Sequence, residues 1–129
     1  VHKRRVKGAK NTVEAKEVVG EVEGRTCVLI DDMIDTGGTI VAAADQLAER
    51  GASHIFACTT HGVFSDPAID RIKNSRIEKV AMTNTLPLPP EKQCDKIEVL
   101  SVAAIIAAAI DAVFEDSSVS EIFGGRNLS

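Results

Sequence analysis

The sequence predicts an α/β domain with a parallel sheet covered by helices on both faces. Short apolar stretches rich in β-branched residues alternate with segments of helical periodicity along the chain. Glycine, proline and aspartate separate the two kinds of segment. We expect strands at residues 17–23, 27–31, 54–60, 77–83 and 97–100, and helices at residues 39–50, 67–72 and 102–114.

The elements expected in residues 1–31 are predicted from the distribution of charged residues and from the alternation of apolar and polar residues. Residues 1–13 are basic and are predicted to form a loop. Residues 17–23 alternate valine with charged or small residues, which indicates a short strand. Residues 27–31 begin with four apolar side chains in a row, which suits a central strand buried on both faces of a parallel sheet.

The helix at residues 39–50 has a clear apolar face and a glycine, Gly51, at its C-terminal end. The side chains expected on that face are Ile40, Ala44, Leu47 and Ala48. Further along, Pro67 starts a short helix through Ile69 and Ile72, and residues 84–96, with three prolines, form a long loop.

The last helix should begin after Ser101, whose hydroxyl can cap it. Its apolar side chains recur at helical spacing, so this face is expected to pack inward. They are Val102, Ile105, Ile106, Ala109, Ile110 and Val113.

Composition fits one globular domain of 129 residues, with 44% hydrophobic and 26% charged residues. The net charge of −4 argues against bulk nucleic-acid binding. The charge is uneven, since residues 1–25 hold seven Lys and Arg against four Glu. The longest apolar run, residues 102–110, is too short to cross a bilayer, so no membrane partner is expected.

Three cysteines, Cys27, Cys58 and Cys94, have no CxxC spacing. We expect free, buried thiols in a reducing cytoplasm. No signal peptide is expected, because the basic N-terminus has no apolar core behind it. The chain begins at Val1 inside a basic segment, which suggests a piece of a longer protein.

Residues 28–39, VLIDDMIDTGGT, carry most of the functional information. The predicted strand ends in Asp31 and Asp32, and ligands of open α/β sheets bind beyond the carboxyl ends of strands. Carboxylates accept hydrogen bonds from a ribose diol and can hold Mg²⁺.

Asp35 leads into the second half of this motif, Thr36-Gly37-Gly38-Thr39, directly before the helix. Glycine amides at a helix N-terminus form an anion cradle, and threonines add hydroxyl donors. The loop has neither the GxxxxGK[ST] nor the GxGxxG pattern. A sugar monophosphate therefore fits better than a triphosphate or a dinucleotide.

The motif VLIDDMIDTGGT resembles the PRPP-binding motif of type I phosphoribosyltransferase folds, which are three-layer α/β domains. Four further segments resemble ribose-phosphate pyrophosphokinases, also called PRPP synthetases. They are HKRR at residues 2–5, CTTHGVFSDPAI at 58–69, VAMTNTLPL at 80–88 and SVSEIF at 118–123. The resemblance covers residues 1–129 and corresponds to the C-terminal half of that transferase, without its N-terminal ATP-binding half.

The resemblance implies transfer of the diphosphoryl group of ATP to the 1-hydroxyl of ribose 5-phosphate, which gives PRPP and AMP with Mg²⁺. It implies that Asp31 and Asp32 hold the ribose hydroxyls and Mg²⁺. It assigns the 5-phosphate to the loop residues Asp35, Thr36, Gly37, Gly38 and Thr39. Lys3 and Arg5 match the family's catalytic residues, so residues 1–13 are expected to be its flexible basic catalytic loop.

The tail residues Ser118, Ser120 and Phe123 match part of the family's allosteric site for phosphate or ADP. The resemblance also implies a cytoplasmic homo-oligomer, usually a hexamer. It further implies that the isolated chain binds ribose 5-phosphate but is inactive without the N-terminal half.

Two alternative functions stay open. A phosphoribosyltransferase would use PRPP instead of making it, but it would need a base-binding segment for which the sequence offers no candidate. A non-catalytic regulatory subunit associated with PRPP synthetase should have lost the basic loop or the DTGGT motif, and both are intact here.

Overall fold

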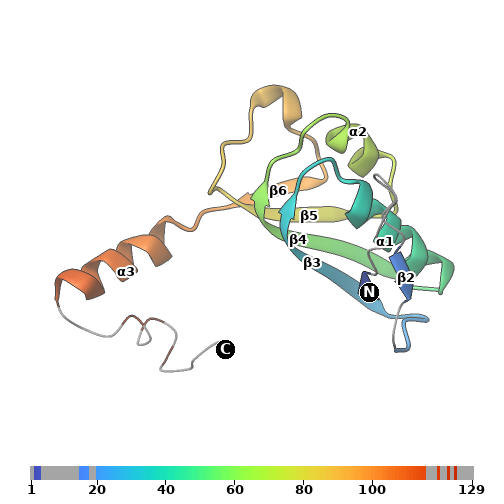
Figure 1. Ribbon diagram of the computed structural model, residues 1–129, viewed down its shortest axis with the longest axis horizontal. Coiled ribbons are helices and arrows are strands. Elements are labelled where there is room, and N and C mark those ends of the chain that lie inside the picture. The colour runs from blue at the N-terminus through green and yellow to red at the C-terminus, as the bar shows by residue number, and fades with distance from the viewer. Residues whose placement is uncertain are drawn as a thin grey trace, which may run out of the picture.

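The computed structural model describes residues 2–3, 15–17, 20–115, 119, 122 and 124. Four parallel strands form one sheet in the order β3-β4-β5-β6, and β1 and β2 form a separate antiparallel pair (Figure 1). The strands are β1 His2–Lys3, β2 Ala15–Glu17, β3 Thr26–Ile34, β4 His54–Gly62, β5 Lys79–Thr83 and β6 Ile97–Leu100. The helices are α1 Gly38–Glu49, α2 Ala68–Lys73, the 3₁₀ turn η1 Pro90–Lys92 and α3 Ala103–Phe114. The predicted α/β class with a parallel sheet is confirmed.

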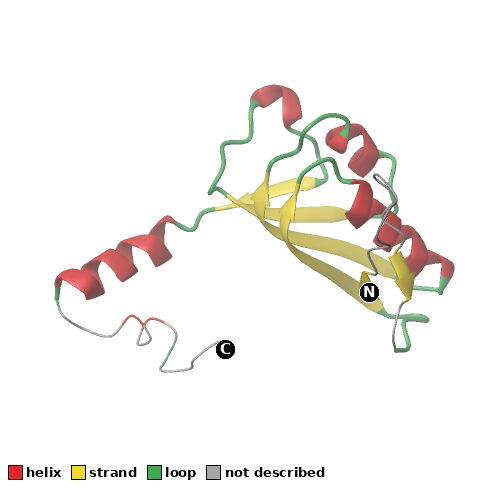
Figure 2. Ribbon diagram, in the orientation of Figure 1, coloured by secondary structure: helices red, strands yellow, loops and turns green. Residues whose placement is uncertain are grey.

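The helices α1 and α2 lie on the same face of the sheet (Figure 2). The strand order explains this, because each strand pairs with the next one in the sequence and the order never reverses. Crossovers between parallel strands are almost always right-handed, so successive crossovers in one direction place their helices on one face.

The core lies between this face of the sheet and the two helices. As predicted, α1 buries Ile40, Ala44 and Leu47, and α2 buries Ile69 and Ile72. The sheet contributes Ile55 and Ala57 from β4, and Val80 and Met82 from β5. Phe64 and Ile77, which lie in the connections between elements, are also part of the core. The largest fully buried side chains of the described chain are those of Phe64, Ile72, Ile77, Met82 and Val80.

The opposite face of the sheet is not covered in the described part of the chain. Val28 is 54% exposed and Ile30 is 82% exposed, although the sequence predicts β3 as a central strand buried on both faces. This expectation is wrong for two reasons. β3 is an edge strand, paired only with β4 among the described strands, and the one-way strand order leaves its second face without a crossover helix.

Other predicted strand bounds also differ. The strand expected at residues 17–23 is β2 at Ala15–Glu17, because a turn replaces its second half. β4 ends two residues later than expected, at Gly62, and β5 begins two residues later than expected, at Lys79. Arg25 N donates to Val22 O at 3.0 Å, and Gly24 has a φ of 67°. Residues 2–3, predicted as loop, pair with β2 instead.

The last helix forms, but it does not pack as predicted. The N-cap residue is Val102, not Ser101 as expected, and no side chain in the described chain caps the helix. Ser101, one residue earlier, accepts a hydrogen bond through its Oγ from Ala103 N at 3.2 Å. Four of the side chains expected to face inward are exposed, namely Ile105, Ile106, Ile110 and Val113. Val102 and Ala109 are half-buried, and Ala112 is the buried residue of the helix. Figure 1 shows α3 extending to one side of the sheet instead of lying on it.

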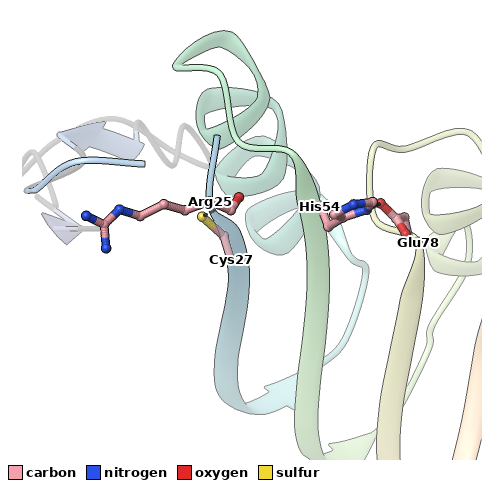
Figure 3. A network of polar contacts seen from close by, with 4 residues as sticks. All are labelled: Arg25, Cys27, His54 and Glu78. Atoms are coloured by element: carbon pink, nitrogen blue, oxygen red, sulfur yellow. Dashed lines mark hydrogen bonds and ion pairs between the residues drawn. The ribbon is translucent and has the colours of Figure 1, made fainter. Parts of the chain in front are cut away.

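At the amino ends of the strands, His54 Nδ1 lies 2.8 Å from Glu78 Oε1, and Cys27 Sγ lies 3.9 Å from Arg25 O (Figure 3). Both partners of the His54–Glu78 pair are exposed, so the contact contributes little to stability. Cys27, Cys58 and Cys94 are free, as predicted, but each is half-buried instead of buried.

Gly62, the last residue of β4, has no room for a side chain. A Cβ at this position would lie 2.7 Å from both Met82 Sδ and Phe64 Cε2, and both neighbours are buried. We expect Gly62→Ala to lower the free energy of unfolding by about 1–3 kcal/mol, because the core must shift to admit the methyl group. Urea unfolding followed by circular dichroism measures the change.

Gly38→Ala is the matched control for this prediction. Its Cβ would meet only the end of the Arg71 side chain, at 3.4 Å, and alanine favours a helix more than glycine does. A stability for Gly62→Ala equal to that of Gly38→Ala would contradict the packing described here.

Candidate functional site

Asp31 and Asp32 lie inside β3, within its last four residues. The sequence predicts a strand that ends at residue 31, whereas β3 extends to Ile34. β4 continues to Gly62, so the ladder also continues, with Asp31 opposite Thr59 and Met33 opposite His61. The acids nevertheless remain at the carboxyl edge of the sheet, where α/β proteins bind ligands.

The two carboxylates have different surroundings. Asp31 is half-buried and Asp32 is exposed, as expected for neighbours in a strand whose side chains alternate between faces. Asp32 N donates to Asp31 Oδ1 at 3.0 Å, which orients the Asp31 carboxylate.

The strand is followed by a tight loop that opens directly into α1. Gly37 is the N-cap residue, with φ 74° and ψ −2°, a left-handed conformation that favours glycine. No side chain of the described residues caps the helix there, and Val41 N donates to Gly37 O at 3.1 Å. The first-turn amides and the positive end of the helix dipole are therefore presented to the loop region, as an anion site requires.

Helix α2 lies next to this loop. A Cβ on Gly37 would lie 3.5 Å from Ala68 Cα, so the loop leaves room for about one methyl group between Gly37 and the first turn of α2. Arg71 Nη1 donates a hydrogen bond to Thr36 O at 2.9 Å. Nothing in the sequence singles out Arg71, because its helix is short and the partner of its hydrogen bond lies 35 residues away.

The acids and the loop line one hollow of about 310 Å³. All seven substrate-binding residues predicted from the sequence belong to it. The lining residues are Asp31, Asp32, Met33, Ile34, Asp35, Thr36, Gly37, Gly38, Thr39 and Ile40. The volume is enough for a pentose phosphate, which is smaller than the drug-sized ligands of typical pockets.

The predicted Mg²⁺ ligands, Asp31 and Asp32, fit an ion that is shared with substrate. In the described part of the chain, no group of three or more His, Cys, Asp or Glu side chains could hold a metal. Mg²⁺ is commonly bound by one or two carboxylates, with water and substrate oxygens completing its shell. A carboxylate pair lining a sugar-sized hollow matches that pattern.

A polar network lies beside the hollow at the ends of β4 and β5. His61 Nδ1 and Thr85 Oγ1 share a hydrogen bond of 2.8 Å, and Thr83 Oγ1 donates to Thr60 O at 2.6 Å. Thr85 Oγ1 also donates to Thr60 O at 3.1 Å. This network ties the start of the long loop after β5 to β4, so His61 shapes that loop.

The other predicted site residues belong to the two ends of the chain. Lys3 lies in β1, which pairs with β2. Arg5 and the three predicted allosteric residues, Ser118, Ser120 and Phe123, lie outside the described residues.

Within the described chain, no helix is long and apolar enough to span a bilayer.

Comparison with known proteins identifies one family. The model of the phosphoribosyl synthetase-associated domain matches residues 6–124. Ribose-phosphate pyrophosphokinase of Streptomyces avermitilis is 57% identical over 123 residues, which are 95% of this chain and 38% of that protein. The enzyme of the same name from Caldanaerobacter subterraneus is 50% identical over the same coverage.

A solved structure agrees with these relatives. Phosphoribosylpyrophosphate synthetase from Mycobacterium smegmatis matches with a TM-score of 0.74 and 48% identity, over 77% of this chain and 33% of that one. The chain thus spans less than two fifths of the length of the relatives it matches.

Proposed function

Because the chain belongs to the phosphoribosyl synthetase-associated domain family, we propose that it forms the ribose 5-phosphate half of a ribose-phosphate pyrophosphokinase. The full-length enzyme transfers the diphosphoryl group of ATP to the 1-hydroxyl of ribose 5-phosphate and releases PRPP and AMP. One observation carries the proposal: a single hollow at the carboxyl end of β3 is lined by both acids and by the glycine loop at the N-terminus of α1.

The loop binds the 5-phosphate. The left-handed Gly37 and the start of α1 at Gly38 turn backbone amides toward an anion, and the helix dipole adds to the attraction. Thr36 and Thr39 supply hydroxyl donors. Asp35, at the same loop, accepts hydrogen bonds and fixes the loop relative to the sugar.

The acids bind the ribose and Mg²⁺. Asp31 and Asp32 accept hydrogen bonds from the sugar hydroxyls and together hold the ion with substrate oxygens. Mg²⁺ supplies charge neutralisation for the transferred phosphoryl groups.

Lys3 and Arg5 act as the catalytic cations of the full-length enzyme. Diphosphoryl transfer spreads negative charge over non-bridging oxygens, so catalysis consists largely of positioning and positive charge. A loop at residues 1–13 that closes over ATP would bring both cations to the reaction and exclude water. ATP binding needs the part of the enzyme that this chain does not contain, so the isolated chain binds ribose 5-phosphate without turnover.

The finer assignments form part of the same proposal. The enzyme is a cytoplasmic homo-oligomer, in agreement with three free cysteines and with the apolar surface left open on the sheet and α3. Ser118, Ser120 and Phe123 contribute to a regulatory site for phosphate or ADP. No nucleic-acid or membrane partner is proposed.

Calorimetry with ribose 5-phosphate and Mg²⁺ tests the site on the chain itself. We expect Thr39→Val and Asp35→Ala each to weaken binding about tenfold, because each removes one hydrogen-bonding group from the hollow. Thr26→Val, at the exposed start of β3, and Asp45→Ala, exposed on α1, are matched controls that should bind like the parent chain. If all four variants bind alike, the site assignment is wrong.

An AMP-forming assay on the full-length enzyme tests the reaction. With ATP, Mg²⁺ and ribose 5-phosphate it should release AMP and PRPP in equal amounts. If it instead consumes PRPP when a nucleobase is added and forms no AMP, the protein is a phosphoribosyltransferase. No turnover in either assay would favour a regulatory subunit.

A further inference from the structure

Arg71 connects α2 to the loop that we assign to the phosphate. The residue lies on α2, on the side that faces the start of α1. Its Nη1 donates to Thr36 O at 2.9 Å and would lie 3.4 Å from a Cβ at Gly38. The guanidinium therefore lies close to both ends of residues 36–38, which form the turn of the loop.

The position of Arg71 is fixed by the packing of its helix. Ala68, Ile69 and Ile72 are buried in the core, which leaves α2 little freedom to rotate. Ala68 lies close to Gly37, since a Cβ at Gly37 would be 3.5 Å from Ala68 Cα, and Arg71 follows Ala68 by three residues on the same face of the helix. The residue next to the loop and the cation that bonds to the loop thus lie on one face of α2.

The hydrogen bond from Arg71 has a consequence for the adjacent amide. Thr36 O and Gly37 N–H belong to one planar trans peptide, in which the carbonyl and the N–H point in opposite directions. Holding the carbonyl against α2 directs the Gly37 N–H away from α2. The charge of Arg71 is also not neutralised nearby, since no ion pair within the described chain involves it.

We propose that Arg71 is a positioning residue for phosphate binding: it holds the Thr36–Gly37 peptide so that the Gly37 amide faces the ligand's phosphate. This inference rests on the proposed function and assigns a role to a residue outside the binding motif. The guanidinium acts through the loop and also adds a positive charge next to Thr36.

Calorimetry on Arg71→Met, with ribose 5-phosphate and Mg²⁺, tests the role. We expect the dissociation constant to rise about tenfold, because the donor that fixes the peptide is lost. Arg71→Lys should recover part of the affinity, since a cation that can donate is retained. In the full-length enzyme, KM for ribose 5-phosphate should rise similarly while KM for ATP stays unchanged.

Lys73→Met is the matched control, because it removes one positive charge from an exposed position on the same helix. Equal weakening by Lys73→Met and Arg71→Met would overturn the proposal, since a general charge effect would then explain both. Parental affinity in a folded Arg71→Met would also overturn it. If the parent chain itself binds no ribose 5-phosphate, the proposed function fails first, so the two failures are distinguishable.

A variant that fails to fold is separated from one that fails to bind by its circular dichroism and urea midpoint. If Arg71→Met unfolds, Arg71→Gln provides the second measurement, because its shorter, uncharged side chain cannot place a donor where Nη1 of Arg71 lies. Arg71→Gln should bind ribose 5-phosphate more weakly than the parent chain. Equal binding by Arg71→Gln and the parent chain would show that the hydrogen bond to Thr36 has no effect on phosphate binding.

Discussion

Phe64→Ala should lower the free energy of unfolding of the chain by about 3–5 kcal/mol, the largest stability effect that we expect. Phe64 is 0% exposed and lies in the connection between β4 and α2. Its removal leaves a cavity bounded by residues that cannot collapse freely, because Met82 and Ile72 are themselves fully buried. Domains are typically stable by only about 5–15 kcal/mol, so the change should be a large fraction of the total.

The matched control is Phe114→Ala, since Phe114 is 85% exposed on α3. The same atoms are removed there without forming a cavity, and the effect should stay within about 0.5 kcal/mol. Circular dichroism is the suitable probe for the urea titration, because the chain has no Trp and no Tyr. A small effect at Phe64, or equal effects at the two positions, would contradict the core as described.

Phe64 also links stability to the site. The backbone amides of Val63 and Phe64 both donate to Ile34 O, at 3.0 and 3.2 Å. Ile34 ends β3 and lines the hollow. Loss of packing at Phe64 should therefore loosen the strand end that carries both acids.

Lys3→Ala in the full-length enzyme should lower kcat about 10²–10³-fold, the largest functional effect that we expect. The proposed role of Lys3 is to stabilise charge that develops on the phosphoryl oxygens only as the diphosphoryl group is transferred. Such an interaction affects the transition state more than the ground state, so KM for ribose 5-phosphate should change by no more than about twofold. Steady-state AMP formation gives both constants.

Lys10→Ala, in the same basic segment but outside HKRR, is the control and should leave kcat near the parental value. A Lys3→Ala enzyme with parental kcat would exclude the catalytic assignment. A variant in which only KM for ribose 5-phosphate rises would instead move Lys3 into substrate binding.

The sequence predicts the strand, loop and helix of the site well because each has a local cause. The apolar run predicts β3, the paired glycines predict the turn at Gly37, and helical periodicity predicts the buried face of α1. All seven residues predicted to bind substrate line one hollow, since they are contiguous in the chain.

Long-range features could not be predicted in the same way. Whether β3 is central or at an edge depends on strand order, and nothing in residues 27–31 encodes its neighbours. The end of β3 depends on how far β4 continues beside it. Arg71 reaches the loop across 35 residues, a contact that appears only when α2 packs on α1.

Helix α3, residues 103–114, is a second case in which the sequence does not predict a long-range contact. Its periodicity correctly predicts a helix and an apolar face, but not what that face packs against. In the described chain that face is exposed. Helical periodicity predicts that the apolar face packs against another apolar surface, but it does not predict which surface that is.

The place of β3 at the edge of the sheet has a consequence for how the site is held. Within the described chain, its backbone forms a ladder on one side only, with β4. Its outer N–H and C=O groups can accept a further strand, as open edges of sheets do. Asp31 and Asp32 therefore lie on the strand to which a further strand can be added, and any strand added there would change the geometry of the hollow that they line.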